Sequence, residues 1–246
     1  MQVLKFGGTS VANAQNMSQV IDIVTQAVDR DRTILVASAI SGCTDTLIKI
    51  GNLAAERDET YKELINGLQQ KHHEIIDELL PREKQADSTK VCDSLFDSLR
   101  SIAQGVFLLG ELSPASLDAI QGFGELWSTK ILATKLASIG IATKWIDSRN
   151  IIRTVSKNGK NIVDVQKTYF RINEMVENDP VTQLFVLPGF IASDKQGRTT
   201  TLGRGGSDYT ASLYAVGCKA RILEIWTDVP GMMTSNPKVV PTARTI

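Results

Sequence analysis

The apolar and polar positions of the first forty residues predict two strands with a helix between them. Residues 2–6 and 33–37 have the length and composition of strands, and each run ends in small and polar residues. Between them, apolar residues recur at three- and four-residue spacing, which is one face of a helix: Met17, Val20, Val24 and Val28. This succession predicts a parallel sheet whose carboxyl-end loops lie along one edge.

Residues 47–109 carry two further helical stripes. The first consists of Leu64, Leu68, Ile75 and Leu79, and the second of Val91, Leu95, Leu99, Ile102, Val106 and Leu109. Both predict antiparallel helices that either pack on the sheet or project from it as a lobe. His72 and His73 are the only histidines, and their polar neighbours lead us to expect both at the solvated surface, outside any catalytic triad.

The rest of the chain continues the alternation of helices and strands. Helices are predicted after Gly122 and at 165–176 and 209–216, strands at 142–146, 184–187 and 222–226, and turns at 157–160 and 194–198. No internal repeat or low-complexity linker interrupts this order. The chain is therefore predicted to be an α/β protein with a largely parallel sheet.

Composition narrows the class of protein. The chain has 246 residues, 42% of them hydrophobic and 22% charged, which suits one large α/β domain or two lobes around a cleft. A net charge of zero gives no reason to expect nucleic acid or an acidic membrane surface as a partner. No apolar run approaches a membrane span, and the first residues lack a signal peptide. Three widely spaced cysteines indicate neither disulfides nor a zinc site, so we expect a cytoplasmic protein.

Candidate binding and catalytic residues are most concentrated at residues 202–208, LGRGGSD. Its glycines allow the backbone amides to turn around an anion, and the start of the following helix adds its positive dipole end. Arg204 offers a planar fork for a carboxylate or phosphate, and Asp208 can hold a metal or another cation. Alone, the stretch is equally well explained as a glycine-rich turn that caps a helix.

Similar polar and glycine residues follow other predicted strands, at 5–10, 38–44 and 227–228. Because such ends share one edge of an α/β sheet, these groups are expected to converge. The set suits phosphate handling, although the Walker A and GxGxxG patterns are absent. A kinase that phosphorylates a hydroxyl benefits from a base, whereas a carboxylate is already ionised at pH 7. The lack of a site histidine therefore favours a kinase that forms an acyl phosphate.

Three motifs carry a specific resemblance: KFGGTS at 5–10, LGRGGSDY at 202–209 and WTDVPG at 226–231. Together, and in this order, they resemble the aspartate kinase family, and VANA at 11–14 is most similar to the bifunctional aspartokinase–homoserine dehydrogenases. The resemblance covers essentially the whole chain. It implies the amino acid kinase fold, a three-layer α/β/α sandwich with a largely parallel sheet. It also implies an acceptor lobe at 1–200 with a helical insertion at about 47–120, and the start of an incomplete nucleotide lobe at 201–246.

The implied activity is transfer of the ATP γ-phosphoryl group to the β-carboxylate of L-aspartate, the first step of lysine, threonine and methionine synthesis. The resemblance assigns catalysis to Lys5 and Asp208. It assigns aspartate binding to Ser38, Thr44, Glu125, Arg204 and Ser207, with Glu125 on the ammonium group and Arg204 on the α-carboxylate. It assigns nucleotide or phosphate contacts to Gly7, Gly8, Thr9, Ser10, Gly205, Gly206, Thr227, Asp228 and Lys238. ATP and Mg²⁺ are the expected cofactors, no residue is assigned to a metal, and a homo-oligomer is expected.

Simpler interpretations remain open. Lys5 would then be a solvated strand lysine, Glu125 an acidic residue at a helix N-terminus, and Asp228 a turn cap. Another acyl or carbamate kinase, or a non-catalytic amino-acid-binding module, would share much of the pattern. Met233 and Lys238 depart from the tyrosine and arginine usual in the family. Because the family continues beyond the position of Ile246, we expect a kinase-domain fragment that binds MgATP poorly.

Overall fold

Five parallel strands form the central sheet, in the order β3-β6-β2-β1-β9. The computed structural model describes residues 1–246 except 158–159, 228–230, 232, 236–238 and 246. The strands are β1 (Gln2–Phe6), β2 (Thr33–Ala37), β3 (Thr143–Trp145), β6 (Leu184–Pro188) and β9 (Ile222–Trp226). Each was predicted from its apolar run, and the predicted parallel sheet is confirmed.

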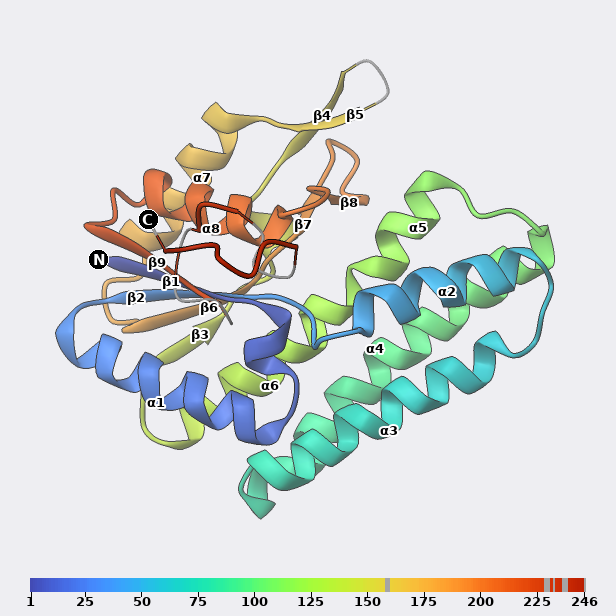
Figure 1. The fold of residues 1–246 in the computed structure, drawn as a ribbon, viewed down its shortest axis with the longest axis horizontal. Coiled ribbons are helices and arrows are strands. Elements are labelled where there is room, and N and C mark those ends of the chain that lie inside the picture. The colour runs from blue at the N-terminus through green and yellow to red at the C-terminus, as the bar shows by residue number, and fades with distance from the viewer. Residues whose placement is uncertain (158–159, 228–230, 232, 236–238, 246) are drawn as a thin grey trace.

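Helices cover both faces of this sheet (Figure 1). One face carries α1 (Ala14–Arg30) and α6 (Phe123–Ser138), and the other carries α7 (Val165–Glu177) and α8 (Gly206–Gly217). Successive strand residues point to opposite faces, so alternate residues enter two separate cores. Leu4, Leu35 and Val186 pack on the α1 and α6 side, and their neighbours Val3, Ile34 and Phe185 pack on the α7 and α8 side. The three-layer α/β/α sandwich is therefore confirmed.

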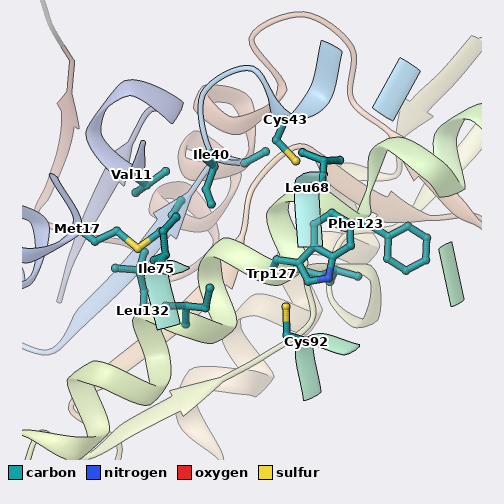
Figure 2. Close-up of a cluster of buried hydrophobic side chains, with 14 of the residues drawn as sticks. Val11, Met17, Ile40, Cys43, Leu68, Ile75, Cys92, Phe123, Trp127 and Leu132 are labelled. Atoms are coloured by element: carbon teal, nitrogen blue, oxygen red, sulfur yellow. The ribbon is translucent and has the colours of Figure 1, made fainter. Parts of the chain in front are cut away.

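Four helices project beside the sandwich as a lobe (Figure 1): α2 (Cys43–Ala55), α3 (Tyr61–Leu79), α4 (Arg82–Leu109) and α5 (Pro114–Gln121). Helix α6 joins this lobe to the sheet, because its large side chains point into the cluster of Figure 2. The rings of Trp127 and Phe96 stack with centroids 4.0 Å apart. Cys43 and Cys92 are buried in the same cluster as free thiols, whereas Cys218 is half-buried.

The expectation for His72 was wrong. Its side chain is fully buried, where it packs against the rings of Phe96 and Trp127, and its Nδ1 donates to the carbonyl of Leu68 at 2.6 Å. Burial lowers the pKa of His72 to about 4, so the ring is neutral at physiological pH. His73 is partly exposed and lies 2.7 Å from Asp93. Neither histidine lines the cleft described below.

Two short hairpins complete the described part of the chain: β4 (Thr154–Lys157) with β5 (Lys160–Val163), and β7 (Ile191–Ser193) with β8 (Thr199–Thr201). The predicted turn at 194–198 joins β7 to β8, where the amide of Gly197 donates to the carbonyl of Asp194. Single 3₁₀ turns occur at η1 (Gly8–Val11) and η2 (Ser148–Asn150). No helix among the described residues has the length and apolarity of a membrane span. The lobe boundary at residue 200 stays a prediction.

Candidate functional site

A cleft of about 370 Å³ opens at the carboxyl ends of β6, β2 and β1, which are neighbouring strands of the sheet. Its walls are the end of β1, the loop from β2 into α2, the start of α6, Phe190 in the turn after β6, and the loop before α8. The cleft brings together ten residues proposed from sequence: Lys5, Gly8, Ser38, Thr44, Glu125, Arg204, Gly205, Gly206, Ser207 and Asp208. Their individual roles stay predictions.

Lys5 and Asp208 form an ion pair across the cleft. The Lys5 Nζ atom lies 2.8 Å from Asp208 Oδ1, although the two groups are not aligned as a hydrogen bond. Strand β1 holds Lys5 with only 8% of its surface exposed, whereas the Asp208 side chain is half-exposed in the first turn of α8. A buried cation paired with a more exposed carboxylate can exchange that partner for another anion in the cleft.

Glu125 is the most unusual group in the cleft, because its carboxyl is almost completely buried. The amide of Ala39 donates to its Oε1 atom at 3.3 Å, while its Oε2 atom has no hydrogen-bond partner among the described residues. Burial raises the pKa of Glu125 to about 8, and the Ala39 amide only partly opposes that rise. A cationic ligand in the cleft would supply the missing partner.

Close packing holds Glu125 in place. A Cβ atom on the preceding Gly124 would lie 2.7 Å from the Cβ of Ala39, so α6 approaches the β2–α2 loop as closely as glycine allows. On the next turn, the Ser128 hydroxyl donates to the carbonyl of Ser38 at 2.7 Å. Ser38 and Glu125 are therefore fixed relative to one another by direct contacts between their segments.

The loop before α8 is shaped by two glycines with left-handed backbone, Gly203 at φ 72° and Gly205 at φ 73°. The amide of Gly206 donates to the carbonyl of Gly203, and the amide of Asp208 donates to the carbonyl of Gly205. These two amides close the turn, so they do not face an anion as the glycine pattern suggested. Arg204 lies exposed between the two glycines, with its side chain lining the cleft.

Several predicted contacts lie beside the cleft or outside the described residues. Gly7 is adjacent to it, since a Cβ there would lie 3.5 Å from Lys5 Nζ, but Gly7, Thr9 and Ser10 do not line its wall. The carbonyl of Thr9 accepts the side-chain amide of Asn16, and Thr227 follows the end of β9. The remaining two, Asp228 and Lys238, fall outside the described residues.

Two cleft residues lie outside the stretches that were singled out from the sequence, Phe190 and Asp45. Phe190 adopts a left-handed backbone with φ 64°, a strained conformation for a residue with a side chain. Its amide donates to the Thr210 hydroxyl at 3.0 Å, which ties the end of β6 to α8. Because Phe190 follows a predicted buried strand, the rule that placed the other residues at this edge also applied to it. Asp45 lies in the first turn of α2 and carried no comparable signal.

Gly189 provides a test of this packing. Replacing it with alanine would place a Cβ atom 2.7 Å from Ser207 Cβ and Oγ, so we expect a loss of about 1–3 kcal/mol in the free energy of unfolding. Gly67→Ala is the matched control, because Gly67 lies in α3 with open space around it, and alanine there should stabilise by up to about 1 kcal/mol. Urea unfolding measures both changes. Equal stability of Gly189→Ala and the wild type would contradict the contact.

The fold and sequence of this chain are similar to those of known proteins. Escherichia coli aspartokinase III in complex with aspartate and ADP superposes with a TM-score of 0.88 at 32% identity, covering 100% of this chain and 53% of that one. Lysine-sensitive aspartokinase 3 of Escherichia coli is 34% identical over an alignment of 252 positions, which covers 99% of this chain and 52% of that protein.

A chloroplastic bifunctional aspartokinase/homoserine dehydrogenase 2 of Arabidopsis thaliana is 30% identical over 240 residues, 97% of this chain and 26% of its own length. The chain thus spans between a quarter and about half of the length of these relatives. The model of the amino acid kinase family matches residues 1–246. The chain therefore belongs to the amino acid kinase family.

Proposed function

We propose that this chain is the catalytic part of an aspartate kinase, which transfers the γ-phosphoryl group of ATP to the β-carboxylate of L-aspartate and yields 4-phospho-L-aspartate. The observation that carries the proposal is the presence in one cleft of a buried carboxyl group with one unpartnered oxygen, Glu125, and a guanidinium, Arg204. The likeness to aspartokinases over the whole chain supports the same substrate.

The two side chains suit the two charges of a free amino acid, because a bound ammonium group would favour the ionised form of Glu125, which holds a proton below about pH 8 in the free protein. The unpartnered Oε2 atom of Glu125 would accept the ammonium group, and the Arg204 fork would hold the α-carboxylate. Aspartate bound in this way would have its β-carboxylate free to reach Lys5. Ser38, Thr44 and Ser207 line the same space and would donate hydroxyl hydrogen bonds.

The reaction needs charge neutralisation more than proton transfer. A β-carboxylate oxygen attacks the γ-phosphorus, the new P–O bond forms, and the bond to the leaving ADP oxygen breaks. No proton has to be removed, because a carboxylate is ionised at pH 7. The barrier comes from bringing two anions together, and the Lys5 ammonium, already 2.8 Å from Asp208 Oδ1, would move onto the transferred group.

The nucleotide would enter beside the glycine loop, with Gly7, Gly8, Gly205, Gly206 and Thr227 near its phosphates. Thr9, Ser10, Asp228 and Lys238 remain proposed phosphate contacts. Among the described residues, no three His, Cys, Asp or Glu side chains lie together as a metal site, and Asp208 already contacts Lys5. The residues present therefore fit a magnesium ion that is carried by the phosphates, where it would neutralise their charge.

Finer assignments follow from the same proposal. The product would enter lysine, threonine and methionine synthesis, the setting would be the cytoplasm, and the full-length protein would be a homo-oligomer. The alternatives are another acyl or carbamate kinase of this fold and a non-catalytic amino-acid-binding module. The presence of Arg204 and Glu125 in one cleft favours a free amino acid over the substrate of another acyl or carbamate kinase. The buried Lys5 beside the cleft glycines favours catalysis over simple amino-acid binding.

Calorimetric titration with matched ligands tests the charge pairing. We expect wild-type protein to bind L-aspartate, and to bind succinate, which lacks the ammonium group, and β-alanine, which lacks the α-carboxylate, far more weakly. Arg204→Lys keeps the charge but loses the fork, so aspartate affinity should fall about tenfold while the already weak β-alanine binding hardly changes.

Arg198→Lys is the control, because Arg198 is an exposed arginine of the β7–β8 turn that does not line the cleft. An equal loss of aspartate and β-alanine affinity in Arg204→Lys would contradict the assignment of Arg204 to the α-carboxylate. Absence of phosphoryl transfer to bound aspartate at saturating MgATP, in a hydroxamate-trapping assay, would instead favour the binding module.

A further inference from the structure

The turn after β6 forms part of the cleft wall in a strained conformation. The amide of Ile191 donates to the carbonyl of Gly189 at 2.7 Å, so Phe190 is the central residue of a three-residue γ-turn. With φ at 64°, this is the rare and strained form of that turn. Such a conformation persists only where surrounding contacts hold it. Because Phe190 lines the cleft, the contacts that hold it also shape the cleft.

The contacts that hold Phe190 come from the glycine loop and from helix α8. The Thr210 hydroxyl accepts the Phe190 amide at 3.0 Å, and the Phe190 carbonyl accepts the amide of Leu202 at 2.9 Å. The Phe190 ring lies so close to Gly206 that a Cβ atom there would be 2.8 Å from Phe190 Cδ2. The γ-turn and the glycine loop are therefore packed as one unit.

Thr210 is the residue that links the two parts of this unit. The hydroxyl that accepts the Phe190 amide also donates to the carbonyl of Gly206 at 2.8 Å, so its hydrogen and a lone pair are both used. Gly206 is the first residue of α8, and Ser207 follows it. The Thr210 side chain is fully buried and does not line the cleft, so Thr210 acts only through these neighbours.

We propose that Thr210 is a positioning residue for the aspartate-binding wall of the cleft. Its hydroxyl fixes the point where the loop that carries Arg204 joins α8, and with it the place of Ser207. The inference rests on the proposed function, because that function names aspartate as the ligand. The link between Phe190 and Gly206 is independent of the ligand and can be measured by itself.

Thr210→Val tests the proposal, because valine keeps the shape of the side chain and removes the hydroxyl. The buried Phe190 amide then has no acceptor, the turn relaxes, and aspartate affinity measured by calorimetry should fall about tenfold. Thr210→Ser keeps the hydroxyl and should bind aspartate as the wild type does. Wild-type affinity in Thr210→Val, or the same loss in both variants, would overturn the role of the hydroxyl.

Thr168→Val is the matched control for lost stability. Thr168 is also a fully buried helical threonine, and its hydroxyl accepts the backbone amide of Arg153 at 3.1 Å, away from the cleft. Both valine variants should unfold at a lower temperature, because each leaves a buried amide unpartnered. Thr168→Val should nevertheless keep wild-type aspartate affinity. An equal loss of affinity in the two valine variants would reduce Thr210 to a merely structural role.

Hydrogen exchange of backbone amides measures the link without any ligand. In Thr210→Val, the amides of Phe190, Leu202 and Gly206 should exchange faster than they do in the wild type and in Thr168→Val. Unchanged exchange at these amides would overturn the proposal. Failure of the wild type to bind aspartate would contradict the proposed function instead, and faster exchange in Thr210→Val would still establish the link.

Discussion

Replacing Glu125 with glutamine is expected to stabilise the unliganded protein above pH 8 by on the order of 3–5 kcal/mol. The free protein holds this carboxyl almost completely buried, with one unpartnered oxygen, and burial raises its pKa to about 8. Glutamine has the shape of the protonated acid and needs no ionisation. The same change should weaken aspartate binding by about 2–5 kcal/mol, because the ligand ammonium loses its buried partner.

The pH dependence follows from the direction of the shift. Between pH 4.5 and about 8 the folded protein keeps the Glu125 proton that the unfolded chain has lost. Glu125 therefore destabilises the wild type progressively as pH rises through this window, and its contribution is constant above and below it. The stability difference between Glu125→Gln and wild type should be near zero below pH 4.5 and largest above pH 8.

Urea unfolding at pH 4.5, 6.5 and 8.5 measures this difference. Glu63→Gln serves as the control, because Glu63 is an exposed glutamate on α3 and its replacement should change stability little at any pH. A stability gain that is the same at pH 4.5 and pH 8.5 would show that Glu125 is not held protonated by burial. Retained aspartate affinity in Glu125→Gln would remove it from the proposed ammonium site.

Replacing Lys5 with methionine is expected to lower the turnover number of phosphoryl transfer about 10²- to 10³-fold, with a small change in aspartate affinity. The Lys5 ammonium is the buried cation of the cleft, 2.8 Å from Asp208 Oδ1, and its charge matters most while the phosphoryl group passes between two anions. Methionine keeps the length of the side chain and removes only the charge. The Asp208 carboxylate then has no ion-pair partner, but it is half-exposed, so solvation by water compensates for most of the lost interaction.

Hydroxamate trapping of the acyl phosphate measures turnover, and calorimetry measures aspartate binding by the same variant. Lys49→Met, an exposed position of α2 outside the cleft, is the matched control. The proposed role of Lys5 predicts a large fall in turnover at saturating substrate. Normal turnover at saturation together with lost aspartate binding would make Lys5 a substrate anchor instead.

Most strands, and the sheet edge where the cleft lies, could be predicted from the sequence. Strands that are buried on both faces of the sheet occur in the sequence as continuous apolar runs. The runs at 33–37 and 184–187 are nearly all apolar, as central strands of a parallel sheet must be. The order of strands and loops then places Lys5 and Ser38 at one edge without further information, whereas Glu125, in the first turn of α6, was assigned only through the family resemblance.

Other features depend on tertiary packing that the residues adjacent in sequence do not indicate. His72 follows Gln69, Gln70 and Lys71, so the local pattern is polar, yet the helical turn aims its ring at Phe96 and Trp127. The glycines at 203–206 predict freedom of the backbone but not which amides close the turn. The left-handed backbone of Phe190 has no sequence signature, because it results from contacts made after the chain has folded.

Helix α6 also determines which side of the cleft can adapt to a ligand. Its buried residues surround the helix: Phe123, Gly124, Glu125, Leu126, Trp127, Ser128, Thr129, Ile131, Leu132, Ala133 and Leu136. Moving the helix would disturb the sheet and the helical lobe together, so the Glu125 side of the cleft is a stationary wall. The facing loop at 203–205 is exposed and held by two left-handed glycines. Any closure around a substrate would therefore come from the loop that carries Arg204. Such a movement would bring Arg204 to the α-carboxylate of a substrate whose ammonium group already contacts Glu125.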